Sequence, residues 1–215
     1  MSGVRTWLAE PHEAEPVARL LVAFRNHLAP GVPTPAPGSQ GGLAAPAGGR
    51  RALEGSPGVP TPAPGSQGGL AAPAGGRRAP ERSPWPSDNA ILAAVERLME
   101  DPQTEYLLAA RDGDSPPAGV IQLRYRFSVW TAAPDCWLED LFVSAEARRS
   151  GCGAALVSLA LERAALRGCR RIELDTNEDN EPALALYRRM GFSEHSKTSG
   201  ARDLFLGRRI EPAAD

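Results

Sequence analysis

The sequence predicts an α/β (α+β) fold in which a mixed central sheet carries helices on both faces. Outside one internal segment, apolar residues recur at strand-like and helix-like spacings in turn along the chain. The predicted order is strand, two helices, three strands, helix, strand, helix and two strands. Such an alternation is typical of a sheet that is covered by helices.

The internal segment, residues 29–87, is predicted to be a disordered insertion within a single domain that spans residues 1–215. It holds 13 of the chain's 21 prolines and 13 of its 22 glycines. With so few large apolar side chains, it cannot bury enough surface to offset the entropy lost on ordering. Residues 30–52 recur identically as residues 57–79, at a period of 27. Each copy has only one leucine, so we interpret the repeat as a duplication within a tolerant loop rather than as a solenoid.

The first elements lie on either side of the insertion. Alternating apolar residues predict a short strand over residues 4–8, and residues 11–27 form a predicted helix because their apolar residues recur at helical spacing. Ser87 is an N-cap candidate for a second helix, which runs through Leu98. Three strands are then predicted over residues 105–111, 118–130 and 136–143. A run of turn-forming residues, typical of a hairpin loop, separates the first two.

The second half of the order has a helix, a strand, a helix and a closing hairpin. The first of these helices covers residues 151–167, and a glycine directly after residue 167 supplies its stop. Residues 170–175 are predicted to be a strand, and residues 181–190 a helix that also ends at a glycine. From residue 192 onward, the remaining chain is predicted to form a two-stranded hairpin.

Charge and cysteine usage restrict the function classes. The net charge is -2, but the insertion carries about +3, which leaves the remainder near -5. This balance argues against a nucleic-acid partner and mildly favours a cationic substrate, although ordinary solubility explains it equally well. The three cysteines lack disulfide or zinc-site spacing, so no metal is expected. Without a signal sequence or a membrane-spanning apolar run, we expect a cytoplasmic protein with no membrane partner.

A phosphate-binding turn is predicted after the 136–143 strand. There, Arg148-x-x-Gly151-x-Gly153 follows a polar loop and opens a helix. Glycines let a ligand approach the backbone, and free amides at a helix N-terminus favour an anion. The sequence has neither a Walker loop nor the third glycine of the dinucleotide fingerprint, so coenzyme A is the leading anion. Taken alone, the turn fits a simple glycine-containing helix cap equally well.

The turn belongs to a longer pattern. Val143, the Arg148–Gly153 turn, Asn180, Tyr187 and the pair Gly191-Phe192 resemble the signature of the GCN5-related N-acetyltransferase (GNAT) superfamily. The resemblance covers everything except the insertion and implies a mostly antiparallel sheet. Within the superfamily, three further features are similar to the diamine (spermidine/spermine) acetyltransferases, namely Trp130, the run 138–143 and the run 180–189.

The resemblance implies that the chain transfers an acetyl group from acetyl-CoA directly to a primary amine of a small molecule, with polyamine-like compounds among the candidates. It implies Glu139 as the general base and Tyr187 as the acid that protonates the leaving thiolate. Asp140 is assigned to substrate binding. Strand alternation places it on the face opposite Glu139, although a bulge of the kind found in the family would bring the two closer. From the residues alone, Glu139 also fits a structural ion pair, and Tyr187 a packed core position.

The resemblance also implies which residues hold the coenzyme. A backbone N–H of the strand would meet the oxyanion, and such a donor is typically worth about 3 kcal/mol in the transition state. Asn180 would both cap the helix at 181–190 and bond the coenzyme. Cys152 would contribute its amide and not act as a nucleophile, since no His or Asn is spaced to support it. Together the implied coenzyme residues are Leu141, Phe142, Val143, Arg148, Arg149, Ser150, Gly151, Cys152, Gly153, Ala154 and Asn180.

Some questions stay open at this point. Of the three histidines, only His195 is expected to lie where it could reach the site. Acetylation of a protein N-terminus or lysine is an alternative activity. Another alternative is a CoA-binding interaction module without chemistry, with the insertion as its partner-binding arm. A homodimer is the assembly that related enzymes suggest.

Overall fold

A computed structural model describes residues 3–28, 85–196 and 199–206 of the chain. The strands are β1 (Arg5–Leu8), β2 (Thr104–Ala110), β3 (Gly119–Ser128), β4 (Ala133–Val143) and β5 (Ile172–Glu173). The helices are α1 (Ala14–Leu28), α2 (Asp88–Met99), α3 (Cys152–Leu166) and α4 (Glu181–Arg189), with short 3-10 turns η1 (Pro11–Glu13) and η2 (Ala145–Ala147). The predicted disorder of residues 29–84 and the repeat within them lie outside the described residues.

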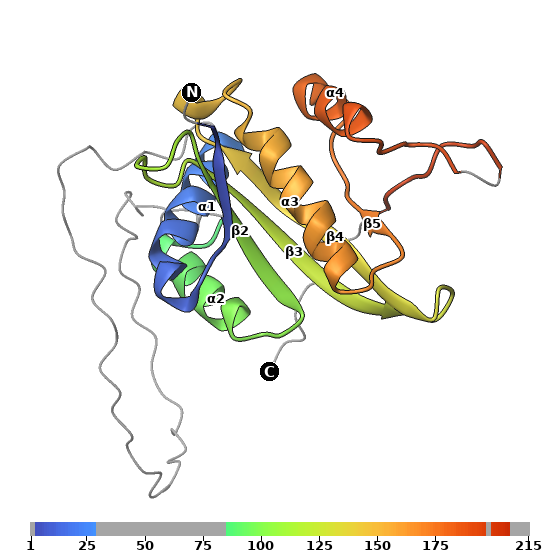
Figure 1. Ribbon diagram of the computed structural model, residues 1–215, viewed down its shortest axis with the longest axis horizontal. Coiled ribbons are helices and arrows are strands. Elements are labelled where there is room, and N and C mark those ends of the chain that lie inside the picture. The colour runs from blue at the N-terminus through green and yellow to red at the C-terminus, as the bar shows by residue number, and fades with distance from the viewer. Residues whose placement is uncertain (1–2, 29–84, 197–198, 207–215) are drawn as a thin grey trace, which may run out of the picture. The chain divides into compact units, whose positions relative to one another are not determined.

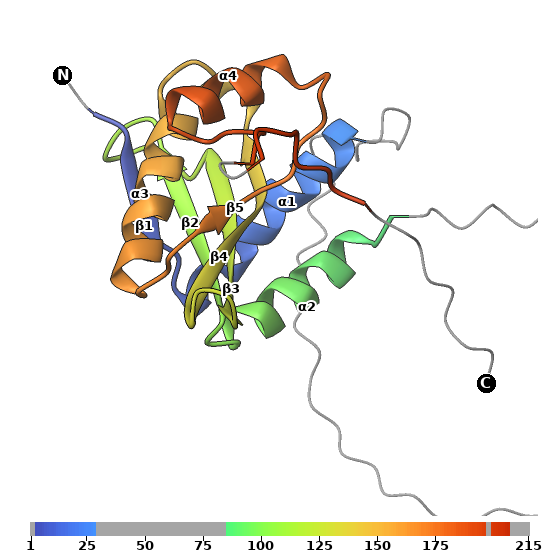
Figure 2. The same ribbon diagram turned by 90° about the vertical axis from the view of Figure 1, so that its right-hand side faces the viewer.

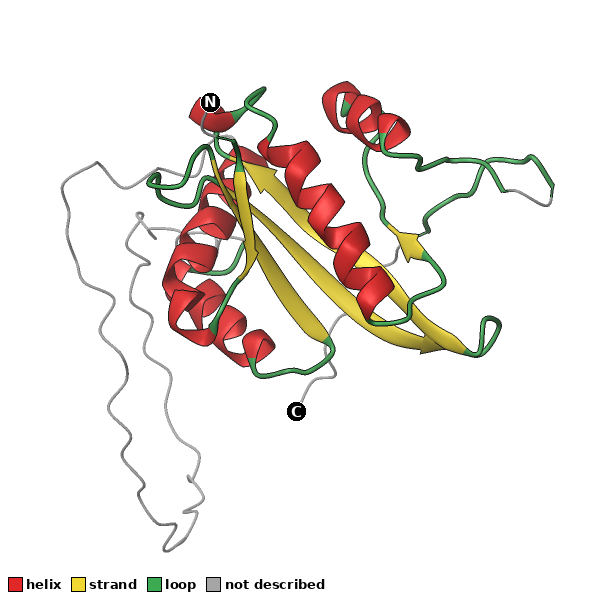
Figure 3. Ribbon diagram, in the orientation of Figure 1, coloured by secondary structure: helices red, strands yellow, loops and turns green. Residues whose placement is uncertain are grey.

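The sheet is mixed and mostly antiparallel, as predicted. Its strand order is β1-β2-β3-β4-β5. The first four strands pair antiparallel, and β5 pairs parallel to β4 (Figure 3). Because β4 and β5 run in the same direction, the residues that follow them emerge at the same edge of the sheet.

Helices cover both faces of the sheet, which confirms the predicted fold class. Figures 1 and 2 show α1 and α2 on one face and α3 on the other. Side chains alternate between the two faces along each strand, so each face has its own apolar cluster. In β2, Leu108 packs in the cluster under α1 and α2, whereas Leu107 packs in the cluster under α3. These two buried layers hold the strands that form the site described below.

The junction after the insertion is part of the folded domain. The Ser87 hydroxyl accepts a hydrogen bond from the Ala90 amide at 3.3 Å, which confirms the predicted N-cap of α2. Arg25 of α1 donates to the Pro86 carbonyl at 2.7 Å and to the Asp88 carboxylate at 2.8 Å. Pro86 and Ser87, the last two residues of the predicted insertion, therefore contact α1 and α2.

Two predicted strand elements near the C-terminus are present only in shortened form. Of residues 170–175, only Ile172 and Glu173 pair with β4, opposite Cys136 and Trp137. The expected closing hairpin is reduced, in the described part, to one isolated bridge between His195 and Arg202. Apolar alternation indicates that a segment can lie in a sheet, but pairing depends on a neighbouring edge, and β5 leaves β4 after two residues.

Candidate active site

A groove of about 850 Å³ lies beside β4 where β5 diverges from it. Its size suits a small organic ligand. Three carboxylates line it, those of Glu139, Asp140 and Asp175, together with Tyr187 of α4. The other lining residues are mostly aromatic, aliphatic or basic, and include Phe24, Leu28, Arg124, Arg126, Trp137, Leu141, Asn180 and Phe205.

A bulge in β4 brings two of these carboxylates together. Val120 pairs with Phe142 and Gln122 with Glu139, so Asp140 and Leu141 both lie opposite Ile121. Asp140 has a left-handed backbone, with φ 51°. Gln122 pairs with Tyr106 on β2 and with Glu139 on β4, so Glu139 lies on the same face of the sheet as Tyr106. The predicted bulge is present and interrupts the strict alternation at Asp140, and Glu139 and Asp140 both line the groove.

The three carboxylates have no bonding partners among the described residues, whose hydrogen bonds and ion pairs include none to Glu139, Asp140 or Asp175. Burial raises the pKa of Glu139; the charges of Asp140 and Asp175 add to this, and that of Arg124 opposes it. Asp140 faces the groove, where partial desolvation and the charge of Asp175 raise its pKa as well. The groove is thus a place where positive charge on a ligand would be stabilised.

Tyr187 stands at the same groove. Its side chain is buried, and its ring lies beside that of Phe192, with centroids 5.7 Å apart. Burial and then the charge of Asp175 raise the pKa of Tyr187 to about 12. The phenol therefore keeps its proton at neutral pH and can donate it. Tyr187 is both a packed residue and a groove residue, which reconciles the two interpretations left open by the sequence.

The predicted phosphate turn has the backbone shape that anion binding needs. Gly151 adopts φ 95° and Arg149 φ 63°, which turns the chain sharply before α3. The first hydrogen bond of α3 runs from the Ala155 amide to the Gly151 carbonyl at 3.0 Å. The preceding amides, those of Cys152, Gly153 and Ala154, consequently have no helical acceptor and lie at the positive end of the helix dipole.

Side chains within the turn hold its shape. The Arg148 guanidinium donates from Nε to the Val143 carbonyl at 3.2 Å, which ties the turn to the end of β4. The Ser150 hydroxyl lies 2.6 Å from the Ala147 carbonyl and 3.1 Å from the Cys152 sulfur. A Cβ on Gly153 would lie 3.4 Å from Leu186 Cδ2, so this glycine faces α4. Arg149 is exposed and forms no described ion pair, which leaves its charge available to a ligand.

Two predictions about individual residues need correction. Asn180 occupies the N-cap position of α4, but its side chain makes no capping bond. Its Nδ2 instead lies 3.4 Å from the Thr176 hydroxyl, and the residue lines the groove. His27 was not expected to reach the site, yet its Nε2 is 3.5 Å from Arg148 Nη2. His27 follows Phe24 on α1, and that helix packs beside the end of β4, a contact the sequence alone does not reveal.

Sequence reasoning missed three charged groove residues, namely Arg124, Arg126 and Asp175. Asp175 follows β5, and Glu139 and Asp140 lie near the end of the parallel strand β4, so the topology brings the three carboxylates to one edge. The predicted strand at 170–175, placed beside 136–143, was a usable signal for Asp175. Arg124 lies in β3 opposite Trp137, in register with the groove. Locating it required the β3–β4 pairing.

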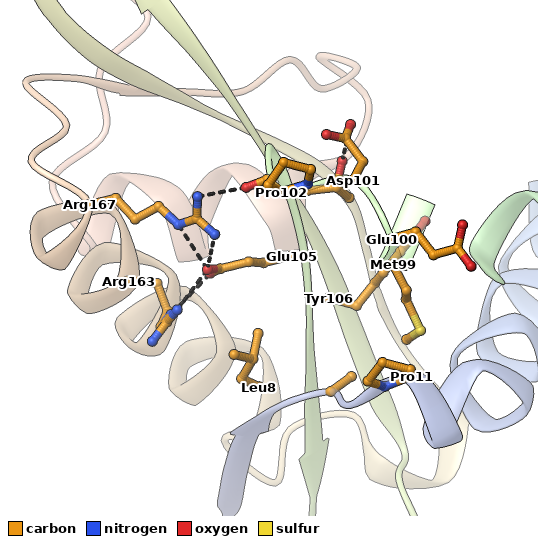
Figure 4. A pocket seen from close by; sticks show the side chains of 12 residues that line it. Leu8, Pro11, Met99, Glu100, Asp101, Pro102, Glu105, Tyr106, Arg163 and Arg167 are labelled. Carbon is orange, nitrogen blue, oxygen red and sulfur yellow. Dashed lines mark hydrogen bonds and ion pairs between the residues drawn. The ribbon is translucent and has the colours of Figure 1, made fainter. Parts of the chain in front are cut away.

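A second, smaller hollow of about 290 Å³ lies at the β2 side of the sheet (Figure 4). It contains the buried carboxylate of Glu105, which accepts hydrogen bonds from Arg163 of α3 and from Arg167, the C-cap residue of that helix, the shortest at 2.6 and 2.7 Å. The Tyr125 hydroxyl donates to the same carboxylate at 2.9 Å. Burial acts to raise the pKa of Glu105, but these donors outweigh it and lower the pKa. This cluster is saturated with partners and fixes α3 to the sheet.

No group of three or more His, Cys, Asp or Glu side chains in residues 3–28, 85–196 and 199–206 could hold a metal ion. Within the same ranges, no helix has both the length and the apolar character needed to cross a bilayer. The cysteines Cys136, Cys152 and Cys169 are free thiols.

The candidate site thus combines a helix N-terminus with open amides, a strand edge without a neighbour in the described structure beyond Trp137, and a groove that holds carboxylates and a protonated tyrosine. The chain belongs to the acetyltransferase (GNAT) family, whose family model matches residues 76–192. This assignment agrees with the superfamily resemblance of the sequence. The diamine acetyltransferase subtype is a finer assignment, which the family match does not address.

Individual relatives cover different shares of the chain. It is 32% identical over 113 residues to an aminoglycoside N(6')-acetyltransferase type 1 of Acinetobacter genomosp. 13, across 51% of this chain and 77% of that protein. It is 35% identical over 78 residues to a thialysine N-epsilon-acetyltransferase of Sus scrofa, across 36% of this chain and 40% of that one. The chain spans between 27% and 83% of the length of its curated relatives. The solved structure of AAC(6')-Iy with the bisubstrate analogue CoA-S-monomethyl-acetylneamine shares the fold, with a TM-score of 0.57 at 17% identity, covering 97% of this chain and 100% of that one.

Proposed function

We propose that this protein transfers the acetyl group of acetyl-CoA directly to a primary amine of a small cationic molecule. The observation that carries the proposal is the set of three carboxylates without bonding partners in the described structure, beside the protonated Tyr187. Desolvating carboxylates without partners costs stability, and a cationic ligand would recover that cost.

The residues of the turn and of β4 fit coenzyme A. The open amides of Cys152, Gly153 and Ala154, with the exposed charge of Arg149, suit the pyrophosphate. Beyond Trp137, β4 has no neighbouring strand on its β5 side among the described residues, so its backbone at Leu141–Val143 can pair with an extended pantetheine arm. Asn180 faces the groove for a further hydrogen bond. When bound, the coenzyme supplies an activated acetyl thioester.

Glu139 is the proposed base. An amine must lose a proton before it can attack, and a carboxylate with an ordinary pKa is a poor acceptor for that proton. The raised pKa of Glu139 makes it a better one, either directly or through one water. Asp140 and Asp175 would hold the ammonium group beside Glu139 until the proton leaves.

Tyr187 is the proposed acid. With its pKa raised to about 12, the phenol is protonated at neutral pH and can give its proton to the departing thiolate. Cys152 has no such role, because it is buried and its sulfur is contacted by the Ser150 hydroxyl. The transfer therefore proceeds from the thioester to the amine without an acyl-enzyme.

The acceptor class follows from the charge of the groove. Three carboxylates favour an amine of high positive charge, such as a polyamine-like compound or an aminoglycoside, and two of the chain's relatives carry the name aminoglycoside N(6')-acetyltransferase. The diamine-type assignment belongs to this proposal.

The test is thiol release from acetyl-CoA with a panel of amines and peptides. We expect release only when an amine is present, with small cationic amines preferred over peptides. Tyr187→Phe should lower kcat by about 100-fold or more while coenzyme binding stays within threefold. Turnover with peptides alone would assign the protein to protein acetylation. Tight acetyl-CoA binding without turnover on any acceptor would indicate a CoA-binding module and overturn the proposal.

A further inference from the structure

A buried tyrosine and a buried glutamine bridge β2 and β3 on the sheet face that α1 and α2 cover. Tyr106 of β2 lies directly opposite Gln122 of β3, and the two residues are 2% and 3% exposed. The Tyr106 hydroxyl donates to Gln122 Oε1 at 3.1 Å. Burial, and then the charges of Asp140 and Glu139, raise the pKa of Tyr106, so the phenol keeps its proton and serves as the donor of this bond.

The other end of the Gln122 amide lies on the side of Glu139. Gln122 pairs with Tyr106 on β2 and with Glu139 on β4, so the three side chains stand in one row on the same face. Opposite residues of an antiparallel pair have Cβ atoms about 5 Å apart, which brings their polar ends within reach of each other. Because Oε1 accepts from Tyr106, the two N–H donors of Nε2 face away from that tyrosine. The reverse orientation would turn the amide oxygen towards a carboxylate, which cannot donate to it when ionised.

These N–H donors are open to the groove side. The bond from Tyr106 is the one hydrogen bond of Gln122 within the described residues, so Nε2 has no acceptor there. Among the fully buried side-chain nitrogens and oxygens of the described structure, Ser144 Oγ alone lacks a partner. Solvent therefore reaches Gln122 Nε2, although the rest of this side chain is buried. The amide is held from one side and free to donate on the other.

We infer that Gln122, held by Tyr106, is a positioning residue for Glu139, to whose carboxylate it donates once an acceptor amine occupies the groove. The inference rests on the proposed function, because it assigns a support to the proposed base. A donated hydrogen bond fixes the direction of a carboxylate and favours its ionised form. Burial and the neighbouring carboxylates raise the pKa of Glu139, and Gln122 would limit that rise so that the base is ionised when the ammonium group arrives.

The charged and titratable groups that face Glu139 come from several elements, and all of them stay in place when Gln122 is substituted. Arg124 lowers the pKa of Glu139, whereas the like charges raise it. The groups are Arg124 of β3, Asp140 of β4, Asp175 after β5, Tyr187 of α4 and Tyr106 of β2, while α1 lines the groove with the uncharged Phe24 and Leu28. A change in pH dependence on substitution of Gln122 can therefore be assigned to its amide.

The test is the pH profile of kcat/KM in Gln122→Met, which keeps the length of the side chain but has no N–H donor. We expect kcat/KM at neutral pH to fall by about 10-fold and the midpoint of the acidic limb to rise, because Glu139 loses a donor to its ionised form. Gln122→Glu places a like charge opposite Glu139 and should raise the midpoint further. In both variants KM for acetyl-CoA should stay within about threefold, since a base-positioning residue does not hold the coenzyme.

Tyr106→Phe tests the support of the amide. Its loss in kcat/KM should be smaller, about threefold, because the amide remains but can rotate. In the double variant with Gln122→Met the two losses should not add, since Tyr106 acts through Gln122. Tyr125→Phe is the matched control, because the Tyr125 hydroxyl donates at 2.9 Å to Glu105 on the opposite face. It should lower the melting temperature and leave the midpoint of the acidic limb unchanged.

An unchanged midpoint in both Gln122 variants, with melting temperatures that show folded protein, would overturn the inference. Additive losses in the double variant would also contradict it. If Gln122→Met does not fold, Gln122→Glu decides through its midpoint, because it keeps an acceptor for Tyr106. Failure of the wild type to release thiol with any amine would instead refute the proposed acetyl transfer, and this role with it, so the two failures are distinguishable.

Discussion

Two acidic sites on opposite faces of the same sheet have opposite surroundings. Glu105, under α3, is buried and accepts hydrogen bonds from Arg163, Arg167 and Tyr125. Glu139 and Asp140, on the other face, have no bonding partner within the described structure. The pKa of Glu105 is lowered, whereas those of Glu139 and Asp140 are raised. The fold thus supplies donors to one carboxylate site and, within the described structure, leaves the other without them.

The largest expected effect on stability concerns Glu105, whose carboxylate has protein partners. Glu105→Gln should lower the free energy of unfolding by about 2–3 kcal/mol, because two arginines lose the charge that compensates them. Urea denaturation measures this, with Glu162→Gln on the exposed face of α3 as the matched control. If both variants lose the same stability, the Glu105 cluster is not the anchor of α3.

An intermediate effect concerns pH. The pKa of Glu105 is lowered, so its stabilising contribution is fully present above about pH 4.5 and is lost as pH falls through the lowered folded value. The pKa of Glu139 and that of Asp140 are raised, so their destabilising contribution is present at neutral pH and disappears once both are protonated. Unfolding curves between pH 7 and about pH 3 should show the deficit of Glu105→Gln shrinking with acid. A constant deficit would contradict the lowered pKa.

The raised pKa of Glu139 also sets the expected pH dependence of activity. The acidic limb of kcat/KM should have a midpoint above the ordinary value of 4.5 for a glutamic acid, since a protonated Glu139 cannot accept the proton of the amine. The measurement is a pH–rate profile at saturating acetyl-CoA. A midpoint at or below 4.5 would remove Glu139 from the role of base.

The smallest expected effect is a gain in stability. Asp140→Asn removes a charge that is disfavoured first by partial desolvation and then by Asp175, and because solvent still reaches Asp140 and screens its charge, we expect a gain of only about 0.5 kcal/mol. Thermal unfolding without ligand detects a shift of this size, and the same variant should bind amine acceptors more weakly. A loss of stability would mean that Asp140 has a structural partner.

Local signals explain most of what the sequence could predict. The Ser87 cap, the apolar stripe of α3 and the glycine turn before it depend on neighbouring residues, and the structure contains each of them. The fold class followed from their order. The bulge at Asp140 was predicted only from the family resemblance, since nothing in the local spacing of residues requires it.

Features that depend on contacts between distant segments could not be predicted in this way. The apolar pattern of residues 170–175 continues beyond Glu173, but the pairing with β4 ends at that residue, and so does β5. His27 reaches Arg148 only because α1 packs beside the end of β4. Arg124 joins the groove through its cross-strand register. In each case the deciding partner is far away in the sequence.

The most direct test of the contrast between the two sites is to measure kcat/KM for an amine acceptor together with the unfolding free energy in Glu139→Gln. If the site at Glu139 serves a ligand, kcat/KM falls by about 100-fold while stability stays equal to or above that of the wild type. Full activity combined with a loss of stability would contradict this account, since Glu139 would then be a structural residue like Glu105.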